Sequence, residues 1–333
     1  MHWGLIGAST IASEHVIAAI RAQKGNSINA VMSSSTERGR EYASKHSIPD
    51  STTELDEILQ NTAISTVYIS TTNEKHYPQA MAAIAAGKHV LCEKPLAMSV
   101  ADAATMVMAA REKGVVFATN HHLRCAGSHI AIRELIRSGR LGDVLSMRVF
   151  HAVYLPPHLQ GWRINDAKAG GGVIPDITVH DADTVRFHLG EDPQSVVAKA
   201  GVSGLGKGVE DSVMSIWSMQ SGIMVQVHDS FTHKFAGSGL EVHGTEGSMV
   251  ARNVMTQQPV GEIFLIDNEG HHPVPFSDHS LYGYALQHFC EAVSGKGRPA
   301  ADGVDGIKSL AVALAVRRAA EEGCAVEVDY EDF

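Results

Sequence analysis

Residues 1–120 alternate between short apolar runs and segments with helical periodicity, and this alternation constrains the fold more than any other feature. The apolar runs predict strands at 2–7, 28–33, 64–70, 88–92 and 115–119. The segments between them predict helices at 11–23, 36–46, 53–60, 76–86 and 100–113. Buried strands separated by helices are typical of a parallel sheet that helices cover on both faces. We therefore expect an α/β fold whose N-terminal part is a doubly wound, Rossmann-type parallel sheet.

The pattern changes after residue 121. A helix is predicted at 124–138, and strands follow at 144–154, 195–203, 210–219, 223–231, 239–245 and 248–254. Short glycine-containing turns join several of these strands, which indicates antiparallel pairing. Helices at 281–294 and 304–322 complete the chain. The sequence predicts two domains, a cofactor-binding domain at 1–121 and a substrate-binding α+β domain at 122–333 with a large, open, mainly antiparallel sheet.

Composition narrows the class of protein. A net charge of −10 argues against a nucleic-acid partner, which would require a basic face. We expect no membrane association, because no apolar run reaches the roughly 20 residues that a spanning helix needs. The four cysteines are far apart and form no C-x-x-C, so we expect reduced thiols and a cytoplasmic protein. The 19 histidines show no convincing ligand spacing, and we expect no metal site.

The segment GLIGASTIA at residues 4–12 resembles a variant of the dinucleotide-binding fingerprint G-x-G-x-x-G. Gly7 takes the first glycine position, and Ser9 and Ala12 take the second and third. Backbone amides of such a turn, here with Thr10 and Ile11, can bind a pyrophosphate at a helix N-terminus. The Ser9 hydroxyl could donate to a phosphate oxygen. A tight β–α turn without a ligand is the alternative interpretation.

The end of the second predicted strand reads VMSSSTERGR and carries no acidic residue. Enzymes that use NAD usually have a carboxylate there, which binds the ribose 2′-hydroxyl. Ser33 and Ser34 instead offer hydroxyls, and Arg38 offers a guanidinium suited to a phosphate. We therefore predict a preference for NADP(H). In the alternative interpretation the serines cap the next helix and Arg38 is a solvated surface charge.

Four further segments carry a family resemblance. STTNEKH (70–76), KHVLCEKPLA (88–97), ATNHHLR (118–124) and GGGVIPDITVHDAD (170–183) resemble the Gfo/Idh/MocA oxidoreductases. The resemblance covers the whole chain and implies hydride transfer between NADP(H) and a small sugar ketone. It implies further cofactor contacts, namely from Thr71, Asn73, His76, Glu93, Lys94 and Asn120. In this family the peptide before the proline of E-K-P is often cis, and the sequence leaves the isomer at Pro95 open.

Asp176 and His180 are four residues apart in a predicted helix, so their side chains share one face. A carboxylate one turn from an imidazole can orient the ring and stabilise its protonated form, as a general acid requires. The family context favours this role over an ordinary surface pair. Lys94 is the other candidate, either as a proton donor or as a cation that polarises the ketone oxygen. The division of proton donation between Lys94 and His180 stays open.

Substrate contacts are expected from the catalytic pair Asp176 and His180 and from four more residues, His121, Arg124, Trp162 and Arg163. For these four, packing within the protein is an equal alternative. The rival functions are a dehydrogenase of another sugar or of inositol, a non-catalytic NADP-sensing regulator and, more remotely, a glycosidase that uses NAD transiently. The oligomeric state is open between monomer and homo-oligomer, and we favour a monomer.

Overall fold

The computed structural model describes residues 1–331 and separates them into two compact units. The first unit combines Met1–His121 with Tyr282–Ile307, and the second combines His122–Leu281 with Lys308–Tyr330. The domain ranges expected from the sequence, 1–121 and 122–333, stay predictions, and residues 332 and 333 lie outside the described part. The units of the structure add the segment Tyr282–Ile307 to the first of them.

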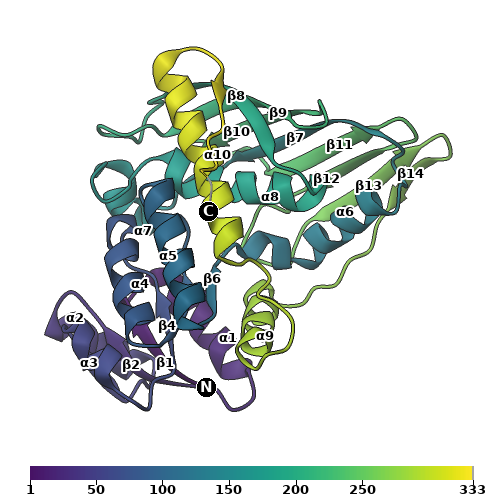
Figure 1. Cartoon of the computed structure of the whole chain (residues 1–333). Helices are drawn as coiled ribbons and strands as arrows, with labels where there is room; N and C mark the ends of the chain where they lie inside the picture. The colour runs from purple at the N-terminus through teal and green to yellow at the C-terminus, as the bar shows by residue number, and fades with distance from the viewer. Residues whose placement is uncertain (332–333) are drawn as a thin grey trace. The chain divides into compact units, whose positions relative to one another are not determined.

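The first unit contains a six-stranded sheet with the order β3-β2-β1-β4-β5-β6, in which every pairing is parallel (Figure 1). The strands are β1 (His2–Ile6), β2 (Ser27–Met32), β3 (Asp50–Thr52), β4 (Thr66–Ile69), β5 (His89–Cys92) and β6 (Phe117–Thr119). The helices between them are α1 (Ile17–Ala22), α2 (Thr36–Lys45), α3 (Leu55–Gln60), α4 (His76–Ala85) and α5 (Val100–Lys113). This confirms the doubly wound Rossmann sheet. The strand order reverses between β1 and β4, which is where ligands bind in such sheets.

Helix α9 (Leu281–Val293) reaches the first unit from far along the chain. The ring of Phe289 lies 5.4 Å from that of Trp3, and both side chains are buried. The Trp3 indole N–H donates to Asn26 Oδ1 at 2.8 Å, so its polar atom is satisfied within the core. Burial of these two apolar rings stabilises the packing of α9 at the start of β1.

The second unit is built on a nine-stranded sheet with the order β14-β13-β12-β11-β7-β10-β9-β8-β15. The strands are β7 (Val144–Ala152), β8 (Pro193–Gly201), β9 (Ser212–Met219), β10 (Met224–Ser230), β11 (Gly239–Gly244), β12 (Ser248–Arg252), β13 (Glu262–Asp267), β14 (Gly270–Pro273) and β15 (Val326–Glu327). Only β7 and β10 pair in parallel, which confirms the mainly antiparallel sheet. The sequence did not predict β13, β14 or β15.

One face of this sheet is buried and the other is open. Buried and exposed residues alternate along β9, as a half-buried strand requires. The buried face packs with helices α6 (Gly127–Arg137), α8 (Val179–Leu189) and α10 (Gly303–Glu322) through side chains such as Ile132, Val185 and Val316. Figure 1 shows α6 and α8 beside the sheet. None of the helices in the described residues is long and apolar enough to cross a membrane.

Two helices begin with a π-helical turn, at Ala12–Val16 before α1 and at Ile174–Thr178 before α8. The helix expected over 11–23 is present, and its first part, Ala12–Val16, is a π turn rather than an α turn. A π turn contains one extra residue and is rare, and it occurs most often at functional sites. Both turns fall on segments that the sequence selected, namely the fingerprint and the stretch with Asp176.

Candidate functional site

The fingerprint loop requires glycine at its first position. Gly7 has a φ of 114°, which L-residues rarely adopt. A Cβ there would lie 3.0 Å from the carbonyl carbon of Ser70, at the end of β4. The Gly7 amide donates to the Met32 carbonyl at 3.1 Å. The loop is thus held tightly between the ends of β2 and β4, and no side chain fits in its place.

Ser9 uses its hydroxyl within the protein. It donates to the Ser70 hydroxyl at 2.7 Å and accepts a hydrogen bond from the Ala12 amide at 3.2 Å. The expected hydrogen bond from Ser9 to a phosphate therefore competes with a contact already made. Ala12 is fully buried at the start of the π turn, Ile11 is half-buried and Thr10 is exposed. A residue in the second glycine position has thus become a cap for the helix start.

Helix α2 binds the carbonyl groups of the same loop. Arg38 donates to the Ala8 carbonyl at 2.6 Å, and the Tyr42 hydroxyl donates to the Ser9 carbonyl at 2.9 Å. Burial raises the pKa of Tyr42, so its hydroxyl stays a neutral donor. With these carbonyl oxygens turned toward α2, the loop amides are suited to an anion. A guanidinium has five N–H donors, so Arg38 can bind Ala8 and a phosphate together.

The three serines after β2 have different environments. Ser35 caps α2 by accepting a hydrogen bond from the Arg38 amide at 3.3 Å, and Ser34 is exposed. Ser33 is 3% exposed, and its hydroxyl oxygen has no hydrogen-bond partner among residues 1–331. A buried hydroxyl without a partner costs about 1–3 kcal/mol. Ser33 therefore offers an unused hydrogen-bonding group one residue after Met32, whose carbonyl binds the fingerprint loop.

The E-K-P segment is fixed by a buried network. Glu93 Oε1 accepts hydrogen bonds from the Tyr68 hydroxyl and from Asn120 Nδ2, each at 2.6 Å. Burial, and then the charge of Glu93, raise the pKa of Tyr68, which keeps it a donor. The Lys94–Pro95 peptide is cis, and Lys94 is half-buried. Tyr68 and Asn120 thus fix the side chain of Glu93, the residue directly before Lys94 at the carboxyl end of β5.

His76 joins two loops of the first unit. Its Nδ1 lies 2.8 Å from the Pro95 carbonyl, and its Nε2 lies 3.2 Å from the Thr71 carbonyl. Burial lowers the pKa of His76, so the ring is neutral and has one N–H to donate. The ring has no exposed surface, so its influence on a cofactor would act through these two loops. Thr71 also donates to Gln79 at 2.7 Å, and Asn73 is 5% exposed at the start of a 3₁₀ turn.

In the second unit, the structure brings together three of the predicted residues. The Arg163 guanidinium lies 4.7 Å from the centre of the Trp162 ring, and its Nε lies 3.4 Å from Asp176 Oδ2. The glycines before Asp176 make this arrangement possible. A Cβ at Gly171 would lie 2.6 Å from the Trp162 carbonyl oxygen, and the Gly172 amide donates to the Arg163 carbonyl at 2.8 Å. Trp162, Arg163 and Asp176 therefore form one surface of aromatic, cationic and anionic groups.

His180 lies in the first turn of α8 and is 8% exposed. Its ring packs edge-on against that of His122, with 4.9 Å between the ring centres. The sequence selected His121 for substrate contact, whereas His122 is the member of this adjacent pair that the structure places beside His180. His121 belongs to the first unit and is 3% exposed. The H-H pair was visible in the sequence, but its orientation depends on a 3₁₀ turn at His122–Cys125.

Arg124 has a partner inside the fold. Its guanidinium forms a two-point ion pair with the Asp183 carboxylate of α8, and one of the two contacts, from Nε to Oδ2, is 2.9 Å long. It also lies 5.3 Å from the centre of the Phe187 ring. Arg124 and Asp183 are 7% and 1% exposed in their side chains. The packing alternative for Arg124 therefore has direct support, because these contacts fix the base of α8.

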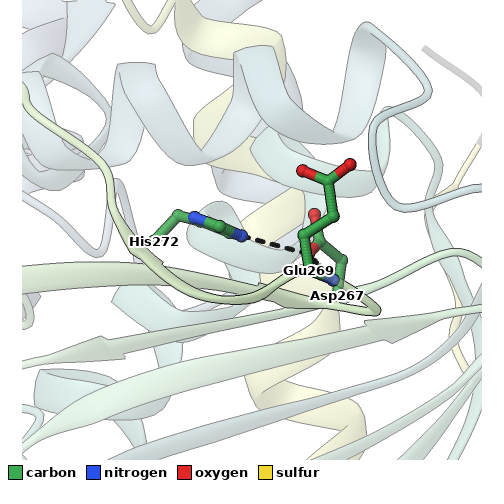
Figure 2. A group of neighbouring side chains, drawn as sticks. All are labelled: Asp267, Glu269 and His272. Carbon is green, nitrogen blue, oxygen red and sulfur yellow. Dashed lines mark hydrogen bonds and ion pairs between the residues drawn. The ribbon is translucent and has the colours of Figure 1, made fainter.

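Within the described residues, one group of side chains has the composition of a metal site. Ligand atoms of Asp267, Glu269 and His272 lie within 4.8 Å of one another at the β13–β14 turn (Figure 2). Asp267 already accepts hydrogen bonds from the Glu269 amide at 2.9 Å and from Arg140 at 3.0 Å, and His272 Nε2 lies 3.1 Å away. The backbone bond and the nearby cations lower the pKa of Asp267. These contacts are those of a turn, and we assign no metal to them.

Comparison with known proteins identifies the family. Residues 1–121 match the description "Oxidoreductase family, NAD-binding Rossmann fold", and residues 129–250 match "GFO/IDH/MocA C-terminal domain". The chain therefore belongs to the Gfo/Idh/MocA family of oxidoreductases. It is 56% identical to the 1,5-anhydro-D-fructose reductase of Ensifer adhaerens over 328 residues, 98% of each chain.

Solved structures show the same architecture. The aldose-aldose oxidoreductase from Caulobacter crescentus superposes with a TM-score of 0.90 at 26% identity, covering 98% of this chain and 99% of that one. A levoglucosan dehydrogenase in complex with NADH and levoglucosan has a TM-score of 0.88 at 22% identity, with 99% and 100% covered. At this identity the second likeness concerns the fold alone.

Proposed function

We propose that the protein catalyses the NADPH-dependent reduction of the C2 ketone of 1,5-anhydro-D-fructose to 1,5-anhydro-D-mannitol. The observation that carries this proposal is the 56% identity to the Ensifer adhaerens reductase over 98% of both chains. An alignment of that extent spans the segments that contain Trp162, Arg163, Asp176 and His180. The environment of these four side chains supports a polar, ring-shaped substrate, because a tryptophan face beside charged groups suits a sugar.

The preference for NADP(H) is part of the proposal. Three observations support it: the end of β2 carries no carboxylate, Ser33 has a buried hydroxyl without a protein partner, and Arg38 lies directly beside the fingerprint loop. A carboxylate at this position would repel a 2′-phosphate, whereas a guanidinium and a hydroxyl would bind it. When bound, NADPH supplies the hydride for the reduction.

Residues of the chain would stabilise and then neutralise the negative charge that develops on the ketone oxygen. We assign His180 as the general acid that gives its proton to this oxygen. Lys94 polarises the same oxygen as a cation, and the buried network of Glu93, Tyr68 and Asn120 keeps its backbone in place. Asp176 stabilises the charged form of His180, and Trp162 with Arg163 binds the sugar ring.

The experiment is a substrate panel with both cofactors. The decrease in NADPH or NADH absorbance would be followed with 1,5-anhydro-D-fructose, other keto-sugars and keto-inositols, and the product would be identified by chromatography. We expect the highest kcat/KM for 1,5-anhydro-D-fructose with NADPH, and 1,5-anhydro-D-mannitol as the product. Preference for another sugar or for an inositol would replace the substrate in this proposal. Tight NADPH binding without turnover of any ketone would favour a cofactor-sensing regulator.

A further inference from the structure

Two aspartates outside the proposed catalytic set face each other in the core of the second unit. Asp181 belongs to the first turn of α8 and Asp229 to β10, and both have 0% exposure. The two carboxyls are close enough to act on each other's titration. Asp181 Oδ2 and Asp229 Oδ1 are buried and accept no hydrogen bond from any donor among residues 1–331. An ionised carboxylate can only accept hydrogen bonds, so these two oxygens can bind each other only through a proton held between them.

The other two oxygens of the pair are bound as well. The Thr178 hydroxyl donates to Asp229 Oδ2 at 2.5 Å, and His151 Nδ1 lies 2.8 Å from Asp181 Oδ1. His151 is in β7 and is the register partner of Asp229 in the parallel β7–β10 pair. The cluster therefore ties the π turn and α8 to the two central strands of the sheet. Thr178 is two residues after Asp176, and Asp181 directly follows His180.

We propose that Asp181 and Asp229 share one proton and thereby hold the π turn with Asp176 and the first turn of α8 with His180 against β7 and β10. The two aspartates are positioning residues for the reduction. Their effect on turnover rests on the proposed function, whereas the shared proton does not.

The pair has a defined dependence on pH. Burial raises the pKa of Asp181 to about 7, and burial together with the charge of Asp181 raises that of Asp229 well above its ordinary value of 3.8. The folded protein thus retains a proton that the unfolded chain has lost. The pair contributes its full stability below pH 3.8 and loses it as the pH rises through the pKa of the folded state. Without the shared proton, two carboxylates in contact repel each other and release the turn.

The titratable groups that face the pair are few. His151 faces it from β7, and His129 of α6 lies close enough to His151 to sense its charge. Burial lowers the pKa of His129 to about 4, so His129 is neutral in the range where the pair changes charge. Among residues 1–331, His151 is thus the ring in contact with Asp181 that can exchange a proton with it.

The test compares Asp229→Asn with Asp229→Ala. An asparagine N–H can replace the shared proton, and its amide oxygen can still accept from Thr178. We expect Asp229→Asn to keep kcat within about threefold at neutral pH and to lose activity less steeply above it. Asp229→Ala removes both bonds and should lower kcat at least about tenfold. Asp192→Asn, which changes a carboxylate paired with Arg186 and Lys308 elsewhere in this unit, is the matched control and should leave the pH profile unchanged.

A second measurement, infrared spectroscopy of the parent protein, tests the shared proton even if a variant does not fold or no substrate reacts. Infrared spectra of the folded protein at neutral pH should contain a protonated carboxyl band that is absent from Asp229→Asn. Absence of this band in the parent protein would overturn the proposal. Equal damage from asparagine and alanine in soluble, folded variants would overturn the positioning role. If no sugar ketone is reduced, the infrared result still decides whether the proton is shared, so the two failures are distinguishable.

Discussion

Arg163 Nε lies 3.4 Å from Asp176 Oδ2, so the carboxylate that the sequence assigns to His180 also has an arginine partner. Both side chains are partly exposed, at 27% and 18%. The arginine can hold Asp176 in its charged form and limit its rotation, which would keep it available to orient an imidazole. Arg163 thus has a second role besides stacking on Trp162, which is to hold the Asp176 carboxylate.

Replacement of Arg163 by glutamine should therefore lower kcat about tenfold and act through Asp176. A double-mutant cycle with Asp176→Asn should give a coupling of about 1 kcal/mol in the transition state, because each single change removes the same contact. Arg148→Gln, which removes an exposed pair with Glu241 in β11, serves as the control. Strictly additive effects of the two changes would show that the pair has no part in turnover.

The cofactor preference can be tested with two arginines of one helix. Arg38→Ala removes the guanidinium beside the Ala8 carbonyl, whereas Arg40→Ala removes an exposed guanidinium from the same helix. We expect Arg38→Ala to raise the KM for NADPH about tenfold or more with little change for NADH, since only NADPH carries a 2′-phosphate. Arg40→Ala should behave as the parent. Ser33→Asp should shift the ratio of kcat/KM values further toward NADH, and an unchanged ratio would contradict the assignment.

Changes at His180 and Lys94 should separate catalysis from cofactor binding. We expect His180→Ala and Lys94→Ala each to reduce kcat by about 10²-fold or more, because each removes a group that acts on the ketone oxygen. The dissociation constant for NADPH, measured by fluorescence titration, should change little for His180→Ala. His243→Ala and Lys113→Ala change exposed or partly exposed side chains of the same types and provide the controls. Near-normal turnover in both catalytic variants would show that these roles are wrong.

The stability of the second unit should depend on a buried histidine pair. His129 Nδ1 lies 3.0 Å from His188 Nε2, and His129 Nε2 lies 3.1 Å from the Val254 carbonyl. Burial lowers the pKa of His129 from 6.5 to about 4, and burial followed by the charge of His129 lowers that of His188. Between pH 6.5 and pH 4 the unfolded chain therefore binds a proton at His129, whereas the folded protein does not. The contribution of the neutral ring to the free energy of unfolding is complete above pH 6.5 and is lost as the pH falls toward 4.

The expected loss for His129 is about 3 kcal/mol over that range. Urea unfolding at several pH values, in the parent and in His129→Gln, would measure it. The Asp181–Asp229 pair changes stability in the opposite direction and is present in both proteins, so the difference between the two profiles isolates the histidine. Identical profiles would contradict the prediction.

Local patterns in the sequence predicted most of the fold. The alternation in residues 1–120 predicted the parallel sheet, and strand-like runs joined by short glycine-containing turns predicted six strands of the second sheet. The strand β14 was missed because its short segment, GHHP, contains no large apolar residue. The segment of β13, EIFLID, is mostly apolar and could have been predicted. The contact of Phe289 with Trp3 also escaped prediction, since it joins residues far apart in the chain and leaves no periodic signal.

The candidate site was predicted as a set of residues but not as a set of contacts. The spacing of Asp176 and His180 suggested a pair, whereas the contact of Asp176 with Arg163 depends on how the glycines at 170–172 fold the loop back. Arg124 and Asp183 are 59 residues apart, and nothing local marks them as partners. Asp181 and Asp229 were missed for the same reason, and because a charged residue in a strand usually faces solvent.

The π turns at Ala12–Val16 and Ile174–Thr178 have a consequence for engineering. Each contains one residue more than an α-helical turn, so a single deletion in either would restore a regular and more stable helix. The same deletion would rotate the residues before it by about 100° relative to the helix that follows. The direction of Asp176 relative to His180 would then change, and the fingerprint amides would turn away from their present direction. Variants with shortened turns should thus have a higher melting temperature and a lower activity.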